Sequence, residues 1–281
     1  MFEINGHTKQ LAIIGWPVDH SFSPKMHNFI SEKMGNNYVY TALPVEPNNV
    51  KAAIDGVRAL NIQGINVTAP HKFEVMKYID EVSPQAQKYG SVNTVVNNNG
   101  HLVGYNTDAD GFYLSLQRAG ITAEGKNILI IGAGGATKPL AVLLSEKGAS
   151  SITILNRTAE KAQALADYVK SINGFEIDTE MKLSEYDIVI NTTSAGMAPQ
   201  LDKYPTDMDR LGFINEKTSV VDMIYNPAET LFLKFARERG AKTLNGSGML
   251  VGQGIVAYEL FTRTKLPDDI FDTVSKAVFG I

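Results

Sequence analysis

A polar segment at the end of a predicted strand carries the side chains best suited to proton transfer. The run Gly64–Val67 indicates a strand, and Asn66 and Thr68 place two polar side chains where open α/β sheets bind ligands. Pro70 then predicts the start of a helix with Lys72 in its first turn. The helix dipole disfavours a cation there, and a lysine kept in such surroundings can transfer protons near neutral pH. The alternative is a solvated surface lysine.

Two serines follow another predicted strand, Leu11–Gly15. Ser21 and Ser23 are two residues apart at its carboxyl end, so their hydroxyls could bind a small oxyanion together. Ser23 also precedes Pro24, which is the pattern of a helix N-cap followed by the first helical residue. From the local pattern alone, capping is the preferred interpretation of Ser23.

A glycine-rich turn lies in the middle of the chain, within Asn127–Ala136. An apolar run gives way to Gly132 and Gly134, and a helical pattern follows. A buried strand, a tight turn and a helix N-terminus together form an anion site, because unpaired N–H groups point out of the turn. The third position of the dinucleotide fingerprint falls on Thr137, so the alternative is an ordinary strand–turn–helix corner.

The next strand supports a dinucleotide site. Ser151–Leu155 is β-branched and ends at Asn156, Arg157 and Thr158, with Lys161 one turn into the next helix. An NAD site usually has an acid at this strand end for the ribose hydroxyl, whereas an arginine accommodates a 2′-phosphate. The pattern therefore favours NADP(H) over NAD(H), and the alternative is an exposed basic helix start.

These residues require two α/β domains with a cleft between them. The N-terminal domain should have a mainly parallel sheet, with a helix over about 24–34, a strand over 38–43 and a helix over 50–60. Asn97–Gly100 predicts a hairpin turn, and a helix over about 109–118 should connect the domains, with Thr107 or Asp108 as its N-cap.

The second domain should be Rossmann-like. We expect it to span residues 108–244, with strands around Ile128, Ile152, Ile188 and Val220. Glycines beside Gln253 predict a close approach by another element or a ligand. The last helices, ending with one over about 268–278, should pack back on the first domain, so that 245–281 completes 1–107.

Composition excludes several classes of protein. With 281 residues, 26 basic and 30 acidic, and no cysteine, the chain offers no basic block for nucleic acid and no thiolate metal site. The five histidines lack metal-ligand spacing, so we predict no metal. No apolar run approaches a membrane span, and the N-terminus lacks the apolar region of a signal peptide. We expect a cytoplasmic protein.

The chain resembles the shikimate dehydrogenase family over nearly its whole length. The resemblance rests on motifs in the family's order: Ser21-Phe-Ser23-Pro24, Asn66-Val-Thr68-x-Pro70-x-Lys72, Val92-Asn93-Thr94, Gly104-x-Asn106-Thr107-Asp108, Gly132-x-Gly134-Gly135-Ala136, Asn156-Arg157-Thr158 and Gly248-Met-Leu-Val-Gly252-Gln253. It implies an NADP-dependent oxidoreductase of the shikimate pathway, which makes precursors of the aromatic amino acids. The implied reaction is the reversible reduction of 3-dehydroshikimate to shikimate by a monomer or homodimer.

The resemblance also implies roles for individual residues. Lys72 and Asp108 match the catalytic pair, in which the lysine transfers the proton and the aspartate orients it and balances its charge. The residues that match the substrate site are Ser21, Ser23, Asn66, Thr68, Asn93, Tyr225 and Gln253. Those that match the NADP site are Gly132, Ala133, Gly134, Gly135, Ala136, Asn156, Arg157, Thr158, Lys161, Thr192, Met223 and Gly246.

The chain departs from the family pattern after the glycine turn. Thr137, Lys138 and Pro139 stand where the family usually has small residues and a basic one, so contacts to the pyrophosphate could differ. Ser23 favours shikimate over quinate, and Arg157 favours NADP. One alternative is a quinate/shikimate dehydrogenase with broader substrate or NAD use. The other is a catalytically silent ligand-binding paralogue.

Overall fold

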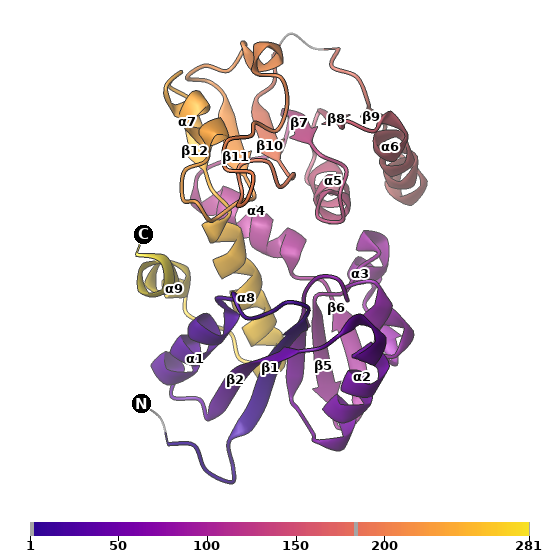
Figure 1. The fold of residues 1–281 in the computed structure, drawn as a ribbon, viewed down its shortest axis with the longest axis vertical. Coiled ribbons are helices and arrows are strands. Elements are labelled where there is room, and N and C mark those ends of the chain that lie inside the picture. The colour runs from indigo at the N-terminus through magenta and orange to yellow at the C-terminus, as the bar shows by residue number, and fades with distance from the viewer. Residues whose placement is uncertain (1–2, 183–184, 281) are drawn as a thin grey trace. The chain divides into compact units, whose positions relative to one another are not determined.

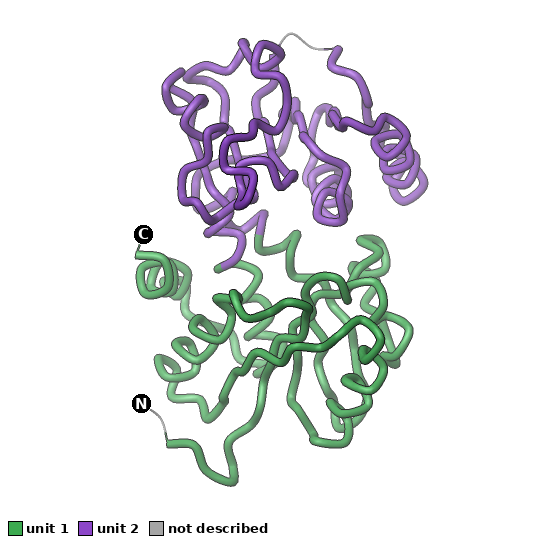
Figure 2. The backbone as a smooth tube through the Cα atoms, in the orientation of Figure 1, with its two compact units in different colours: residues 1–111, 251–281 green, residues 112–250 purple. Residues whose placement is uncertain are grey.

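The chain divides into two compact units. The computed structural model describes residues 3–182 and 185–280. Unit 1 comprises Met1–Gly111 and Val251–Ile281, and unit 2 comprises Phe112–Leu250 (Figure 2). The chain passes from one unit to the other within α4 (Asp108–Arg118) and within α8 (Ser247–Thr262) (Figure 1). The ends of the predicted domains, at residues 1 and 281, lie outside the described residues.

Unit 1 is built on a six-stranded mixed sheet with the strand order β2-β1-β3-β5-β6-β4. Its elements are β1 (Lys9–Gly15), α1 (Ser23–Met34), β2 (Tyr38–Pro44), η1 (Pro47–Asn49), α2 (Val50–Ala59), β3 (Gly64–Val67), η2 (Glu74–Lys77), β4 (Glu81–Val82), α3 (Pro84–Tyr89), β5 (Thr94–Asn98), β6 (His101–Tyr105), the start of α4, most of α8, and α9 (Ile270–Phe279).

The connections between the strands of this sheet determine which neighbours run parallel and which run antiparallel. Strands β2 and β3 both run parallel to β1, and Ile14 of β1 is opposite Val67 of β3. The Asn97–Gly100 turn closes a hairpin, as predicted, so β5 is antiparallel to β6 and to β3. The short β4 pairs parallel with β6. Parallel pairs are therefore the majority, and the polar ends of β1 and β3 lie at the same edge of the sheet.

Helices cover both faces of this sheet. On one face, the buried residues Val50, Ile54 and Val57 of α2 pack in one apolar cluster with Ala12 and Ile14 of β1. On the other, Gly64 of β3 leaves room for α8, because a Cβ at Gly64 would lie 2.3 Å from the Phe261 ring. The long aromatic side chain occupies the space that a side chain on the strand would need.

Helix α1 protects the edge strand β2. The Asn28 amide donates to the main-chain oxygen of Tyr40 at 2.9 Å, and the Tyr40 N–H donates to Asn28 Oδ1 at 2.8 Å. These bonds satisfy main-chain groups that an edge strand would otherwise expose. They also fix the position of Tyr40 relative to α1.

The prediction of a helix that starts at Pro70 is wrong. Residues 69–73 form turns, and only the 3₁₀ helix η2 follows. The Lys72 carbonyl accepts a bond from Val92 N at 2.9 Å, which ties this segment to a distant strand entry. A tertiary bond, rather than a continuing helical ladder, thus sets the main chain at Lys72.

Unit 2 is a six-stranded parallel sheet with the order β12-β11-β10-β7-β8-β9. Its elements are the rest of α4, β7 (Asn127–Ile131), α5 (Thr137–Glu146), β8 (Ser151–Leu155), α6 (Ala159–Asn173), β9 (Ile177–Asp178), β10 (Ile188–Asn191), η3 (Met208–Leu211), β11 (Ser219–Asp222), α7 (Leu231–Arg237), β12 (Lys242–Leu244) and the start of α8. All paired strands are parallel, and the four predicted strands are present.

The glycine turn lies at the point where this sheet reverses its strand order. The chain runs outward from β7 through β8 to β9 and then returns to place β10 on the other side of β7. Doubly wound sheets bind ligands at this switch point, beyond the carboxyl ends of the strands. Ile128, Leu129 and Ile130 of β7 are fully buried, as expected for a central parallel strand. Within residues 3–182 and 185–280, no helix has the length and apolar character needed to cross a membrane.

Candidate functional site

An ion pair joins Lys72 and Asp108 at the end of the unit 1 sheet. The ammonium lies 2.6 Å from Asp108 Oδ2, and the two side chains are 30% and 17% exposed. Asp108 is the first residue of α4, where the helix dipole favours a carboxylate. The predicted helix start, which would disfavour a cation, is absent at Lys72, and this pairing holds the ammonium.

Asn93 fixes the other carboxylate oxygen of Asp108. Its amide donates to Asp108 Oδ1 at 2.8 Å and to Thr107 Oγ1 at 3.1 Å. Its Oδ1 accepts from the Thr107 N–H at 2.8 Å. Both carboxylate oxygens therefore have a donor, and the orientation of Asp108 is set from two sides.

Asn66 is part of the same polar cluster. Its amide donates to the Asn93 main-chain oxygen at 3.2 Å and to Thr94 Oγ1 at 3.0 Å. Its Oδ1 accepts a 2.7 Å bond from the Tyr40 hydroxyl. Thr94 in turn donates to Asn93 Oδ1 at 2.9 Å. Asn66 is thus linked to the Lys72–Asp108 pair through side chains of the sheet.

The structure contradicts the capping role of Ser23. Helix α1 begins at Ser23, Phe22 is the N-cap residue, and no side chain caps it. The Ser23 N–H donates to Ser21 Oγ at 3.2 Å. The two predicted serines therefore lie together, and the sequence signal that misled was Pro24, which fits the first turn of a helix whether or not Ser23 caps it.

Thr68 and Gln253 lie where two segments of unit 1 approach each other closely. A Cβ on Gly15 would lie 2.3 Å from Thr68 Cγ2, so glycine at the end of β1 admits the Thr68 side chain. Gly111 of α4 has the same relation to Gln253, because its Cβ would lie 2.2 Å from the Gln253 nitrogen. The predicted close approach at Gln253 is confirmed, and it brings Gln253 to the helix that begins with Asp108.

In unit 2, the glycine turn closes on the loop after β10. Gly132 has φ +114°, and a Cβ there would lie 2.4 Å from Thr192 Oγ1, so both the backbone and the space require glycine. Thr192 donates to the Ile131 carbonyl at 2.9 Å and lies 2.8 Å from the Thr137 hydroxyl. Thr137 Oγ1 accepts from the Gly134 N–H at 3.2 Å.

The Thr137 side chain therefore makes hydrogen bonds that the glycine or alanine usual at this position of the dinucleotide fingerprint could not make. Its hydroxyl takes up the Gly134 N–H and bonds to Thr192, and it begins α5 fully buried. Lys138 turns to the Tyr168 ring of α6, with its ammonium 3.5 Å from the ring centroid. Pro139 lies in the first turn, where a missing N–H is tolerated. The departure from the family pattern is accommodated by the fold.

The end of β8 carries the predicted polar residues. Asn156 Oδ1 accepts from the Ala133 N–H at 3.2 Å and so ties this strand end to the glycine turn. Arg157, Thr158 and Lys161 are exposed. Thr158 is the N-cap residue of α6 without a side-chain cap bond, so it is not held by helix capping.

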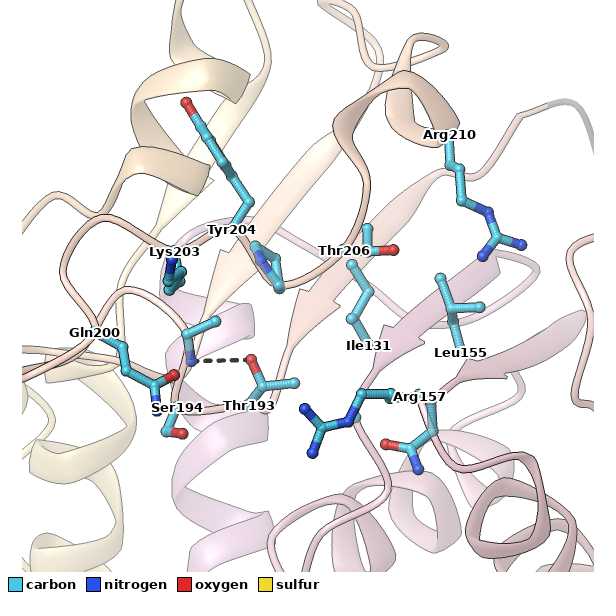
Figure 3. A pocket seen from close by; sticks show the side chains of 14 residues that line it. Ile131, Leu155, Arg157, Thr193, Ser194, Gln200, Lys203, Tyr204, Thr206 and Arg210 are labelled. Carbon is cyan, nitrogen blue, oxygen red and sulfur yellow. Dashed lines mark hydrogen bonds between the residues drawn. The ribbon is translucent and has the colours of Figure 1, made fainter.

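A cavity of about 840 Å³ opens at the ends of β7, β8 and β10 (Figure 3). Arg157, Lys203 and Arg210 supply positive charge to its wall, while Thr193 and Ser194 supply hydroxyls. Figure 3 shows the Arg157 side chain extending toward Thr193, with Arg210 beyond Leu155. The sequence missed Lys203 and Arg210, because 199–215 has neither helical nor strand periodicity.

Strand β11 ends at a buried acid beside two predicted residues. Asp222 accepts from Thr230 Oγ1 at 2.6 Å and from Ile224 N and Asn191 Nδ2, both at 3.0 Å. Burial raises its pKa to about 6. Met223 follows, and a Cβ on Gly246 would lie 2.0 Å from the Met223 oxygen, so these two are adjacent. Burial also raises the pKa of the half-buried Tyr225, which belongs to this loop of unit 2.

Two family models match the chain. One is described as "Shikimate dehydrogenase substrate binding domain" and covers residues 13–95. The other is described as "Shikimate / quinate 5-dehydrogenase" and covers residues 114–204. The first therefore falls in unit 1 and the second in unit 2.

Curated relatives and solved structures agree with these matches. Shikimate dehydrogenase (NADP(+)) of Alkaliphilus metalliredigens is 42% identical over 95% of this chain and 96% of its own length. A crystal structure of a shikimate dehydrogenase in complex with NADP+ has a TM-score of 0.91 and 41% identity, covering 99% of this chain and 97% of that one. Shikimate 5-dehydrogenase from Listeria monocytogenes, in complex with shikimate and NAD, has a TM-score of 0.91 and 34% identity, covering 99% of each chain.

Proposed function

The chain belongs to the shikimate dehydrogenase family, and from this premise we propose that it catalyses the reversible NADP-dependent reduction of 3-dehydroshikimate to shikimate. The observation that carries the proposal is the Lys72–Asp108 ion pair, with Asn93 fixing the second carboxylate oxygen. A dehydrogenase for an alcohol needs one titratable group within reach of the reacting oxygen. This pair is part-exposed at a strand end that is rich in short polar side chains, which suits a ligand with several hydroxyls.

We assign substrate binding to unit 1. Residues 1–107, completed by 245–281, form the proposed substrate-binding and catalytic domain. Ser21 and Ser23 are proposed to bind the carboxylate, because their hydroxyls lie together at the start of α1. The residues proposed to hold ring hydroxyls are Asn66, Thr68, Asn93 and Gln253. Tyr225 is proposed as a substrate-side residue contributed by unit 2.

Lys72 is the proposed proton-transfer group. In reduction, its ammonium donates a proton to the oxygen that becomes a hydroxyl, and in oxidation the amine takes that proton back. Asp108 orients Lys72 through the 2.6 Å bond and balances its charge. Asn93 keeps Asp108 aligned by donating to its other oxygen at 2.8 Å.

Unit 2 supplies residues that fit a phosphorylated dinucleotide. The glycine turn lies at the switch point of a parallel sheet, and the adjoining cavity of about 840 Å³ has Arg157 in its wall. No acid follows β8, and a guanidinium there suits a 2′-phosphate. When bound, NADP(H) supplies the hydride chemistry. The residues proposed to hold it, in 108–244 and just beyond, are Gly132, Ala133, Gly134, Gly135, Ala136, Asn156, Arg157, Thr158, Lys161, Thr192, Met223 and Gly246.

Two of these residues act through the turn. The Thr192 hydroxyl donates to the Ile131 carbonyl and bonds to Thr137, so it connects the residues on either side of the glycine turn. Asn156 also holds the turn, because its Oδ1 accepts a hydrogen bond from the Ala133 N–H. The exposed main chain of 135–136 is then available to pyrophosphate oxygens at the start of α5.

Purified protein with shikimate or quinate and NADP or NAD, in all four pairings, tests the proposal through absorbance of the reduced nicotinamide. We expect turnover chiefly with shikimate and NADP. A quinate kcat/KM within about tenfold of that for shikimate, or about 1.4 kcal/mol, would favour a quinate/shikimate dehydrogenase. Shikimate binding with no turnover in any pairing would favour a silent ligand-binding paralogue, which the intact Lys72–Asp108 pair argues against.

The proposal extends to assembly and location. We infer that the protein works in the cytoplasm as a monomer or homodimer, with small molecules as its ligands. The absence of cysteine suits a compartment in which disulfides do not form. Light scattering during gel filtration tests the assembly, and a higher oligomer would contradict it.

A further inference from the structure

The turn that carries Lys72 (residues 69–73, called the Lys72 turn) is tied to another part of the sheet by His71, to which the function proposed above gives no role. The His71 residue is 1% exposed, and its Nε2 lies 2.7 Å from the Val45 main-chain oxygen. Val45 directly follows β2, which is two strands away from β3 in the order β2-β1-β3. The imidazole therefore connects the loop after β3 to the end of β2, across the end of β1.

The direction of this bond is fixed by its acceptor. A carbonyl oxygen can only accept, so the Nε2 of His71 carries the proton that is shared with Val45. Nε2 keeps this proton both in the neutral tautomer that the bond selects and in the protonated ring. The bond is therefore available in either state, and Nε2 is not free to accept a proton from a ligand.

The Lys72 turn and the end of β2 also bond separately to the end of β1. The Trp16 N–H donates to the Ala69 oxygen at 3.1 Å, and the Val45 N–H donates to the Gly15 oxygen at 3.0 Å. A Cβ on Gly15 would lie only 3.3 Å from the Ala69 oxygen, so glycine leaves room for the turn to cross the strand end. The imidazole completes this arrangement by joining the turn directly to β2.

The main chain is held on both sides of the Lys72 Cα. Before it, the His71 N–H donates to the Thr68 oxygen at 3.0 Å, and after it, the Lys72 oxygen accepts from the Val92 N–H at 2.9 Å. The lysine side chain is long and flexible, so the main chain fixes where it starts while Asp108, 2.6 Å from the ammonium, fixes where it ends. A shift of the turn would move the starting point of this side chain.

We propose that His71 is a positioning residue for Lys72, because its bond to Val45 holds the turn from which the Lys72 ammonium reaches Asp108. For the reacting oxygen, this role rests on the function proposed above. A misplacement of about 1 Å can cost on the order of 10²-fold in rate. Loss of the bond to Val45 should therefore lower kcat although His71 itself contacts neither substrate nor cofactor in this role.

Three substitutions separate the hydrogen bond from the volume of the ring. His71→Gln places an amide N–H near the position of Nε2 and can still donate to Val45. His71→Asn carries the same amide on a side chain that is one methylene shorter and falls short of Val45, and His71→Phe keeps a ring without a donor. Arg58→Met is the matched control, because Arg58 also donates to main-chain oxygens of unit 1, those of Tyr78 and Gly100.

Hydrogen exchange of the Trp16 and Val92 amides tests the anchoring of the turn without any ligand. Both amides donate to oxygens of the Lys72 turn. They should exchange about tenfold faster in His71→Asn and His71→Phe than in wild type and His71→Gln, after correction for the amides of β5, which report on the stability of the unit. Arg58→Met should leave the corrected rates unchanged. Equal corrected rates in wild type and all three His71 variants would overturn the inference.

Turnover and binding test whether the anchored turn serves Lys72. His71→Asn and His71→Phe should lower kcat about tenfold or more, while His71→Gln should stay within about threefold of wild type. The dissociation constants of shikimate and NADP, measured by calorimetry, should change by less than about threefold in all three variants. A merely structural role would lower the midpoint of thermal unfolding, as in Arg58→Met, and leave the kcat of the folded protein unchanged.

The outcomes separate this inference from the proposed function. Wild-type turnover of shikimate, combined with an equal kcat in all His71 variants, would overturn the positioning role and leave the proposed function standing. Wild-type protein without turnover of shikimate would overturn the proposed function, and exchange of the Trp16 and Val92 amides would then decide by itself whether His71 holds the turn. If His71→Phe fails to fold, the comparison of His71→Gln with His71→Asn, which differ by one methylene, decides both measurements.

Discussion

The imidazole of His27 stacks on the ring of Tyr40, with 4.2 Å between the centroids and 4° between the planes. Among the residues that the structure describes, neither ring nitrogen of His27 has a hydrogen-bond partner. Burial lowers the pKa of His27 to about 3, from an ordinary value of 6.5. The imidazole is therefore kept neutral and packs as an aromatic hydrocarbon would.

His27 should make unit 1 sensitive to acid. The unfolded chain binds a proton at His27 below about pH 6.5 and the folded chain does not until about pH 3, so stability falls as the pH is lowered through this window. The loss is on the order of 5 kcal/mol over the whole window. His27→Phe, which preserves the stacking, should flatten this dependence.

Unfolding of unit 1 can be followed by fluorescence of Trp16, the single tryptophan of the chain. His7→Phe, at an exposed position, is the matched control and should keep the wild-type dependence on pH. An unchanged slope in His27→Phe would mean that His27 gains a proton or a partner in the folded state.

Lys72→Met should lower kcat by roughly 10²–10⁴-fold, because a methionine fills the space but cannot carry the proton. The change also leaves Asp108 without its 2.6 Å partner. Lys77→Met is the control, since Lys77 is an exposed lysine that pairs with Glu74 nearby. Initial rates in both directions measure the effect. Undiminished shikimate oxidation in Lys72→Met would rule out the assigned mechanism.

Arg157→Gln should weaken NADP binding about tenfold or more and leave NAD binding unchanged, because the lost guanidinium is proposed to bind the 2′-phosphate. Titration calorimetry with each dinucleotide measures this without turnover. Arg210→Gln tests the other arginine of the cavity wall in the same way. Equal weakening of NADP and NAD by Arg157→Gln would show that Arg157 contacts a part common to both.

Features encoded within a few residues could be predicted from the sequence. The apolar run of β7 and the glycines after it are local, and Gly132 indeed has a backbone that only glycine adopts readily. The hairpin at Asn97–Gly100 is local in the same sense. In each case one short segment contains both the cause and the structure.

Features that depend on distant partners could not be predicted from the local pattern. Asp108, which pairs with Lys72, is 36 positions along the chain, and only the family resemblance connects the two residues in the sequence. Ser23 begins α1 instead of capping it, because Phe22 is the N-cap residue. Lys203 and Arg210 reach the cavity from a segment without periodicity, so no pattern identifies them. Hydrogen-bond polarity, such as the donation from the Tyr40 hydroxyl to Asn66 Oδ1, appears only once the partners are known.

Asp222 should give unit 2 the opposite response to pH. Burial raises its pKa to about 6, so the folded chain retains this proton while the unfolded chain releases it above about pH 3.8. The stability that the protonated carboxyl provides is complete below about pH 3.8 and is lost as the pH rises through about 6. The loss is on the order of 3 kcal/mol. Asp222→Asn stays neutral throughout and should lack this slope.

Hydrogen exchange of the β10 and β11 amides reports on unit 2 and so separates the pH dependence caused by Asp222 from that caused by His27. Between about pH 4 and 6, wild-type protection of these strands should fall with rising pH relative to Asp222→Asn, while the His27 effect acts on unit 1 in the other direction. Asp202→Asn, at an exposed position, is the control. Asp222→Asn can keep the contacts to Ile224 and Asn191 through its carbonyl oxygen and donate to Thr230 through its nitrogen. A parallel dependence on pH in wild type and Asp222→Asn would therefore mean that Asp222 is ionised in the folded protein over this range.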